Sequence, residues 1–186
     1  MNSQYQPAVP LEKTMEVQFV LPSLKISGGI LESIKLAEDI EAAGGIASII
    51  SMWRSPHAVQ QKNVKVHSLS DWATRIPNAL ARLPQLLLRF RRLIKVDKKR
   101  SNKWMFTHYS TLPLALLVPP HRRFVFVQGL EWRFLNNALL SHCLKYFMMF
   151  VYRRSQLIAA NPYLKKALLG EKLVVRGIAP IWADPV

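Results

Sequence analysis

The chain has 186 residues, with 26 Lys and Arg against 11 Asp and Glu, so its net charge is +15. This length suits one compact domain, and because half of the residues are apolar and 20% are charged, an intrinsically disordered chain is excluded. The single cysteine, Cys143, excludes a disulfide scaffold and a zinc site built from several thiolates. The basic excess predicts an anionic partner, such as a phosphorylated substrate, an anionic lipid surface or a nucleic acid.

The first residues, 1–14, are polar, contain two prolines and show no periodicity, which predicts a loose lead-in without a secretory signal. The two most apolar stretches, 112–120 and 143–152, are too short to span a bilayer. We therefore expect a cytoplasmic protein, one that binds the inner face of the plasma membrane peripherally if its basic surface contacts lipid.

Apolar runs and helical periodicity alternate along the chain. A strand is predicted over 15–21, a glycine-containing turn over 22–29, a helix over 30–45 and a second strand over 46–52, which together make a βαβ unit. Further strands are predicted over 64–69, 103–108, 123–129, 157–160 and 172–176, with helices over 79–95, 134–154 and 162–169. The alternation predicts one α/β domain over 15–178, with an open, mainly parallel, Rossmann-like sheet and helices on both faces. We expect six or seven strands, with 123–128 at or near the centre.

Ligands of such sheets bind at the carboxyl ends of the strands. This rule selects four loops, at 22–29, 53–57, 108–111 and 128–133. Because parallel strands all point one way, we expect the segments 26–30 and 128–131 to lie within one ligand's reach of each other, at the same edge of the sheet.

Gly28 and Gly29 separate the first predicted strand from the first predicted helix. Glycines there let the backbone approach a ligand, and the free N–H groups of the helix start attract phosphate or sugar oxygens. The alternative is a tight turn that needs positive φ. The loop lacks the GxGxxG pattern, which disfavours a nicotinamide-cofactor domain.

The strand over 123–129 delivers Gln128, Gly129 and Glu131 to the rim of the sheet, followed by Trp132. A carboxylate and an amide beside an aromatic ring suit a hydroxyl-rich ligand, because they hydrogen-bond hydroxyls while the ring stacks on a sugar face. The alternative is that Glu131 lies near the N-terminus of the next helix, where the helix dipole favours a negative charge.

His108 ends the strand over 103–108, and His57 follows the strand over 46–52. Either histidine suits an acid, a base or a phosphate contact, or a structural residue, because no carboxylate partner can be assigned from sequence. GxSxG, HExxH, Walker A and CxxC motifs do not occur.

The segment from Arg82 to Lys103 has nine Lys or Arg and one acid, Asp97, so its 22 residues carry 9 − 1 = +8. Its apolar residues follow helical spacing: Leu83, Leu86, Leu87, Phe90, Leu93 and Ile94. The remaining surface carries Arg89, Arg91, Arg92 and Lys95, and Pro84 suits the first turn. The helix either packs on the sheet with a solvated basic face, or uses that face to bind an anionic membrane. Nucleic acid is disfavoured, because stacking aromatics and known nucleic-acid-binding signatures are missing.

Taken together, four segments resemble the N-terminal half of a GT-B glycosyltransferase of the retaining kind called group 1 or family 4. They are VQFVLPSLKISGGILESIKLAEDIEAAGGIASIISM at 17–52, FVFVQGLEW at 124–132, YRRSQLIAANPYLKKALL at 152–169 and KLVVRGIAPIW at 172–182. The order and spacing of these segments carry the resemblance, which covers 15–182.

The resemblance implies an acceptor-side domain of a glycosyltransferase of surface polysaccharide synthesis. The acceptor would be a glycan or a lipid-linked saccharide, and one of its hydroxyl groups would attack a nucleotide-sugar. The reaction would need no metal ion or other cofactor. Gly28 and Gly29 would lie near the donor diphosphate and the acceptor. The other substrate-binding residues that the resemblance implies are Gln128, Gly129, Glu131 and His108. The resemblance identifies no catalytic base.

Two positions depart from the family pattern. Gln128 stands where histidine is common, which is similar to polymer-building members such as rhamnosyltransferases, and Arg176 stands where asparagine is usual. Residues 179–186 resemble the start of a linker to a donor-binding half that this chain lacks, so the isolated chain is expected to be inactive. The competing hypothesis is a non-catalytic basic α/β domain that binds an anionic membrane or another polyanion.

Overall fold

The computed structural model describes residues 15–24, 27–53, 64–69, 79–97 and 102–178, with only the helical backbone for 79–83. The predicted lead-in, 1–14, and the predicted linker, 179–186, lie outside the described residues.

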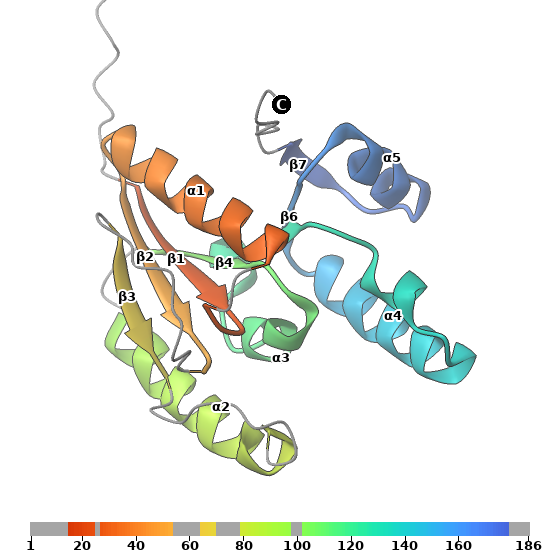
Figure 1. Ribbon diagram of the computed structural model, residues 1–186, viewed down its shortest axis with the longest axis horizontal. Coiled ribbons are helices and arrows are strands. Elements are labelled where there is room, and N and C mark those ends of the chain that lie inside the picture. Colours follow the sequence, from red (N-terminus) through yellow and green to blue (C-terminus); the bar gives the residue numbers. More distant parts are fainter. Residues whose placement is uncertain (1–14, 25–26, 54–63, 70–78, 98–101, 179–186) are drawn as a thin grey trace, which may run out of the picture.

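The described residues form one seven-stranded parallel sheet in the order β3-β2-β1-β4-β5-β6-β7 (Figure 1). The strands are β1 (Glu16–Leu21), β2 (Ile46–Ser51), β3 (Lys65–Ser68), β4 (Lys103–Phe106), β5 (Arg123–Val127), β6 (Gln156–Ala159) and β7 (Val175–Ile178). Every neighbouring pair is parallel. The predicted Rossmann-like α/β architecture is therefore confirmed, with β5 beside the central strand β4.

The helices are α1 (Gly28–Ala42), α2 (Ala79–Val96), α3 (Leu112–Ala115), α4 (Ala138–Tyr152) and α5 (Pro162–Gly170). Short 3-10 turns occur at η3 (Tyr109–Thr111), η4 (Pro120–Arg122) and η5 (Glu131–Phe134). Figure 1 shows α1 on one side of the sheet and α2 and α3 on the other.

Two apolar clusters fill the two faces of the sheet, because side chains alternate between faces along each strand. On the α1 side, Phe19 and Ile49 from the sheet pack with Ile34. On the opposite side, α2, α3, α4 and α5 share one larger cluster with the sheet. There Phe90 meets the ring of Trp104 edge-on, with 5.1 Å between centroids.

Several element boundaries and the place of one proline differ from the prediction. α1 begins at Gly28, so the paired glycines lie in its first turn rather than in the loop before it. α2 begins at Ala79 as predicted, so the expectation that Pro84 lies in its first turn is wrong, and Pro84 lies inside the helix. The last strand begins at Val175 instead of 172, because Lys172 turns the chain with a φ of 59°.

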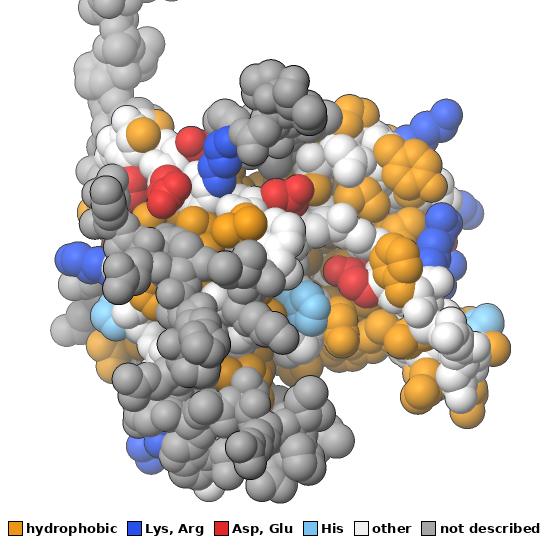
Figure 2. All heavy atoms as spheres, viewed as in Figure 1, with side chains coloured by type: hydrophobic (Ala, Val, Ile, Leu, Met, Phe, Trp, Pro, Cys, Tyr) orange, Lys and Arg blue, Asp and Glu red, His pale blue; other side chains and the backbone are white. Residues whose placement is uncertain are grey.

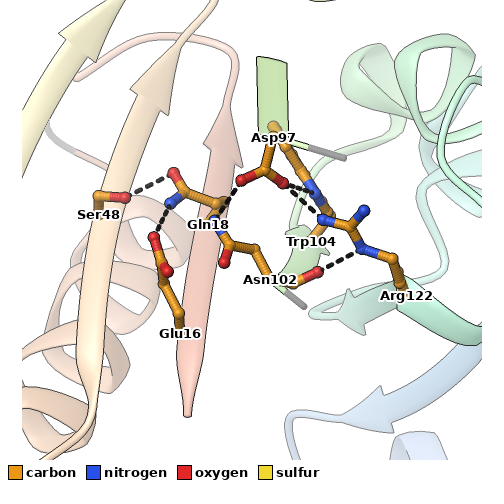
Figure 3. Close-up of polar contacts among 7 residues, drawn as sticks. All are labelled: Glu16, Gln18, Ser48, Asp97, Asn102, Trp104 and Arg122. Atoms are coloured by element: carbon orange, nitrogen blue, oxygen red, sulfur yellow. Dashed lines mark hydrogen bonds and ion pairs between the residues drawn. The ribbon is translucent and has the colours of Figure 1, made fainter. Parts of the chain in front are cut away.

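A buried polar cluster lies near the amino end of β4 (Figure 3). Asp97 at the end of α2 accepts hydrogen bonds from Asn102 (2.5 Å), from the Trp104 indole (3.2 Å) and from Arg122 (2.5 Å). The Arg122 guanidinium also donates to the carbonyl of Asn102 at 2.7 Å. Burial raises the pKa of Asp97, although the Arg122 charge and hydrogen bond oppose this shift.

Candidate functional site

At the carboxyl edge of the sheet, Gln128 connects the end of β5 to the start of α1. Its side-chain Nε2 donates to the carbonyl oxygen of Gly29 at 2.5 Å, and lies 3.3 Å from Ser33 Oγ and 3.4 Å from Glu32 Oε2. The two segments are 99 positions apart in the chain. The structure thus brings together the two loops that the parallel arrangement predicts at one edge.

At Gly29 the side-chain amide of Gln128 occupies the place that a side chain would take. A Cβ at Gly29 would lie 2.5 Å from Oε1 of Gln128 and 3.1 Å from its Cδ. A Cβ at Gly28 would meet nothing within 4 Å. Positive φ is confined to Gly44 and Lys172 among the described residues, so the alternative of a positive-φ turn at Gly28 and Gly29 is wrong.

The N-terminus of α1 carries no side-chain cap. Ser27 is the N-cap residue in extended conformation, and its side chain makes no capping hydrogen bond. Its carbonyl accepts from the N–H groups of Ile30 and Leu31 at 3.1 and 3.0 Å. The first N–H groups of a helix have no partner within the helix, so the start of α1 presents donors and the positive end of the helix dipole to a ligand.

Glu131 begins η5, and its side chain is largely buried. One carboxylate oxygen, Oε2, is buried without a hydrogen-bond partner among the described residues. Burial raises the pKa of Glu131, and a hydrogen bond from its own backbone N–H lowers it in part. The nearby Glu131 charge adds to burial in raising the pKa of Tyr152 well above its ordinary value. A carboxyl group in such surroundings holds its proton more readily than an exposed one.

The expectation that Trp132 stacks on a sugar is wrong, because its side chain is 4% exposed and belongs to the core cluster under α4. Its ring lies 6.5 Å from that of Tyr152, between centroids. The exposed aromatic of this loop is Phe134, which lies two residues later. A Cβ at Gly129 would lie 3.8 Å from Cε2 of Phe134.

His108 follows β4 and shapes the next turn. Its Nδ1 accepts a hydrogen bond from the N–H of Ser110 at 3.2 Å and lies 2.8 Å from Ser110 Oγ. Burial lowers the pKa of His108, which favours the neutral ring that this turn requires. These contacts support a structural role, and Nε2 is the ring atom left for a ligand. His57 lies outside the described residues.

Only part of the basic face of α2 is available to bind an anionic partner, because one of its arginines contacts another segment of the chain. The apolar stripe packs on the sheet as expected, with Leu86, Phe90 and Ile94 buried. Arg89 donates to the carbonyl of Leu69 at 2.7 Å, so this arginine holds the end of β3. Arg89 is itself exposed, and the other exposed cations of this face in the described part of α2 are Arg91, Arg92 and Lys95.

Sequence reasoning missed two polar members of the site, Ser33 and Glu32. Both lie in the first turns of α1, one turn after the glycines, where a helix-periodicity argument assigns them only to the core or to solvent. Ser33 is fully buried, and its hydroxyl donates to the Gly29 carbonyl at 2.7 Å.

Among the described residues, no group of three or more His, Cys, Asp or Glu is arranged to hold a metal ion. A search of the same part of the chain finds no helix with the length and apolar character needed to cross a membrane.

Comparisons with models of known protein families and with curated protein sequences give no match to this chain.

Proposed function

We propose that this chain forms the N-terminal, acceptor-side domain of a glycosyltransferase that moves a sugar from a nucleotide-sugar to a glycan or a lipid-linked saccharide. The observation that carries the proposal is the junction between Gln128 and Gly29, which joins an uncapped helix start to the loop after β5. The order and spacing of the four family-like segments support it further. A rhamnosyltransferase-like enzyme of surface polysaccharide synthesis fits the glutamine at this position best.

In this proposal the edge of the sheet supplies hydrogen bonds and dipoles rather than a covalent intermediate. The N–H groups at the start of α1 face the diphosphate of the donor, whose negative charge grows as the sugar leaves. Gln128 and Glu131 line the acceptor side and hold its hydroxyls. The reaction needs no metal ion or other cofactor, because helix dipoles and basic side chains offset the charge.

A transfer assay on the enzyme that carries this domain together with its donor-binding half tests the proposal. Gly29→Val pushes Gln128 away from α1 and is expected to lower turnover about a hundredfold, because small misplacements of binding groups have effects of that size. Gly170→Val is the matched control, since a Cβ there would meet nothing within 4 Å and Gly170 ends a helix remote from the junction. Equal turnover of the two variants would contradict the proposal.

Calorimetry on residues 1–186 gives a second test. Because the donor-binding contacts are assigned to the other half, this chain should not bind a nucleotide-sugar with micromolar affinity. Micromolar binding would contradict the acceptor-side assignment.

A second candidate function, peripheral binding of an anionic membrane or another polyanion, is favoured by the exposed cations Arg91, Arg92 and Lys95 on α2. It is compatible with a cytoplasmic enzyme that works at the inner face of the plasma membrane.

A further inference from the structure

We propose that the outer face of α4 docks on an anionic lipid bilayer, with the helix lying in the plane of the interface. The surface concerned consists of the exposed side chains of Phe134, Leu139, Cys143, Tyr146 and Phe150, and is called the α4 stripe below.

The α4 stripe is strongly apolar yet uncovered by any described part of the chain. Phe134, Leu139 and Tyr146 are 78%, 72% and 75% exposed, and Cys143 and Phe150 are exposed too. Within the helix, the steps of four, three and four residues from 139 to 150 place these side chains on one line. The opposite face of α4 supplies Met148 and Val151 to the core. Figure 2 shows hydrophobic side chains gathered at the end of the molecule where α4 lies in Figure 1.

Cations flank the stripe at both ends. Arg133 precedes α4, and Arg153 and Arg154 follow it, all three exposed. The Arg154 guanidinium lies 3.9 Å from the centroid of the Phe150 ring, so charge and apolar surface are contiguous there. Long basic side chains at the ends of an interfacial helix reach lipid headgroups while the apolar face enters the acyl boundary.

The charge around the stripe selects a lipid surface over a second copy of this chain. From 131 to 171 the sequence contains six Lys or Arg and two Glu, so its net charge is 6 − 2 = +4. One of these cations, Lys145, is neutralised by Glu171 at 2.6 Å. A symmetric dimer through the stripe would place arginines against arginines, whereas an anionic lipid surface attracts each of these cations.

Docking in this way brings the candidate site to the bilayer. Phe134 begins the stripe and lies beside Gly129, at the loop that also carries Gln128 and Glu131. If the proposed function holds, the acceptor is a lipid-linked saccharide that reaches this edge from the membrane. The docking itself does not depend on sugar transfer, so the two can fail separately.

Cys143 is the one cysteine of the sequence and is exposed within the stripe, so it can report the contact directly. The unaltered chain, labelled there with an environment-sensitive fluorophore, is mixed with vesicles of equal parts phosphatidylglycerol and phosphatidylcholine. We expect a blue-shifted emission that aqueous iodide no longer quenches. The reference protein combines Cys143→Ser with Glu38→Cys, so that its fluorophore lies at an exposed position of α1. The emission of this label should not change when vesicles are added, because this position should stay in water.

Co-sedimentation of unlabelled protein with the same vesicles measures the contribution of the stripe. Leu139→Ser with Phe150→Ser should weaken binding at least about tenfold, because apolar burial is removed while every cation remains. Ile46→Ser with Val66→Ser removes exposed apolar side chains of β2 and β3 and should leave binding unchanged. The thermal unfolding of both variants verifies that they fold.

Three outcomes would overturn the proposal. They are no vesicle binding by the unaltered chain, a shift of the α1 reporter with none at Cys143, or a dimer in light scattering that the stripe variant converts to monomer. The last would show that a second copy covers the stripe.

Discussion

The side chain of Gln128 contacts Gly29, which lies 99 positions earlier in the chain, and occupies the space that a larger residue there would need. Its amide fills the space beside Gly29 and donates to the Gly29 carbonyl at 2.5 Å. Gly29→Ala should therefore destabilise the protein by about 1 kcal/mol, because the loss of this hydrogen bond outweighs the better helix propensity of alanine. In a Gln128→Ala background the same change should stabilise by up to about 1 kcal/mol. Urea unfolding of the wild type, the two single variants and the double variant measures the coupling free energy between the two residues. Additive changes in the free energy of unfolding would show that this contact does not contribute to stability.

Glu131 makes stability depend on pH in a direction that its burial sets. Because its pKa is raised in the folded protein, the folded state holds more protons than the unfolded state between the ordinary and the raised pKa. The free energy of unfolding therefore falls as the pH rises through that window. Glu131→Gln removes this contribution, so the variant should gain stability relative to the wild type as the pH rises above the ordinary pKa of a glutamate, about 4. Urea unfolding at several pH values checks this, and a constant difference would contradict it.

At the scale of elements, Asp97 ties the end of α2 to β4 and to η4. Its side chain and that of Arg122 are 12% and 9% exposed (Figure 3). Asp97→Ala should cost about 3 kcal/mol in the free energy of unfolding, because it leaves the Arg122 guanidinium buried without its carboxylate. Combining Asp97→Leu with Arg122→Met should recover most of this loss.

The matched control for that prediction is the more exposed ion pair between Lys145 and Glu171. These side chains are 38% and 31% exposed, so Glu171→Ala should cost less than about 1 kcal/mol. Chemical denaturation measures both losses. If Asp97→Ala lowers the free energy of unfolding no more than Glu171→Ala does, the buried cluster does not hold α2 in place.

The strands and the long helices could be predicted because short apolar runs and helical periodicity dominate this sequence. The features that could not be predicted from the sequence depend on contacts between residues far apart in the chain. Trp132 follows a strand as a surface aromatic would, but it turns inward against Tyr152. The last strand starts late because the turn at Lys172 follows α5, and no local pattern marks it. Ser33 was missed because its partner is Gln128, almost a hundred residues later.

At the scale of the whole molecule, the parallel sheet collects its loops at one edge while α4 presents an apolar surface next to that edge. The uncapped start of α1, the Gln128 amide and the Glu131 carboxyl group all follow strands that end there. The fold thus places these polar groups beside the exposed apolar side chains of the α4 stripe.

We propose that this edge of the sheet binds the substrates of a sugar-transfer reaction. The most direct measurement is a nuclear magnetic resonance titration of the chain with uridine diphosphate, which detects weak binding. We expect uridine diphosphate to shift the resonances of the Gly28 and Gly29 backbone amides and of the Gln128 side-chain amide, and we expect the Gly28 and Gln128 shifts to be lost in the Gly29→Val variant. Shifts confined to the basic face of α2, at Arg91, Arg92 and Lys95, or no shifts at all, would contradict this proposal.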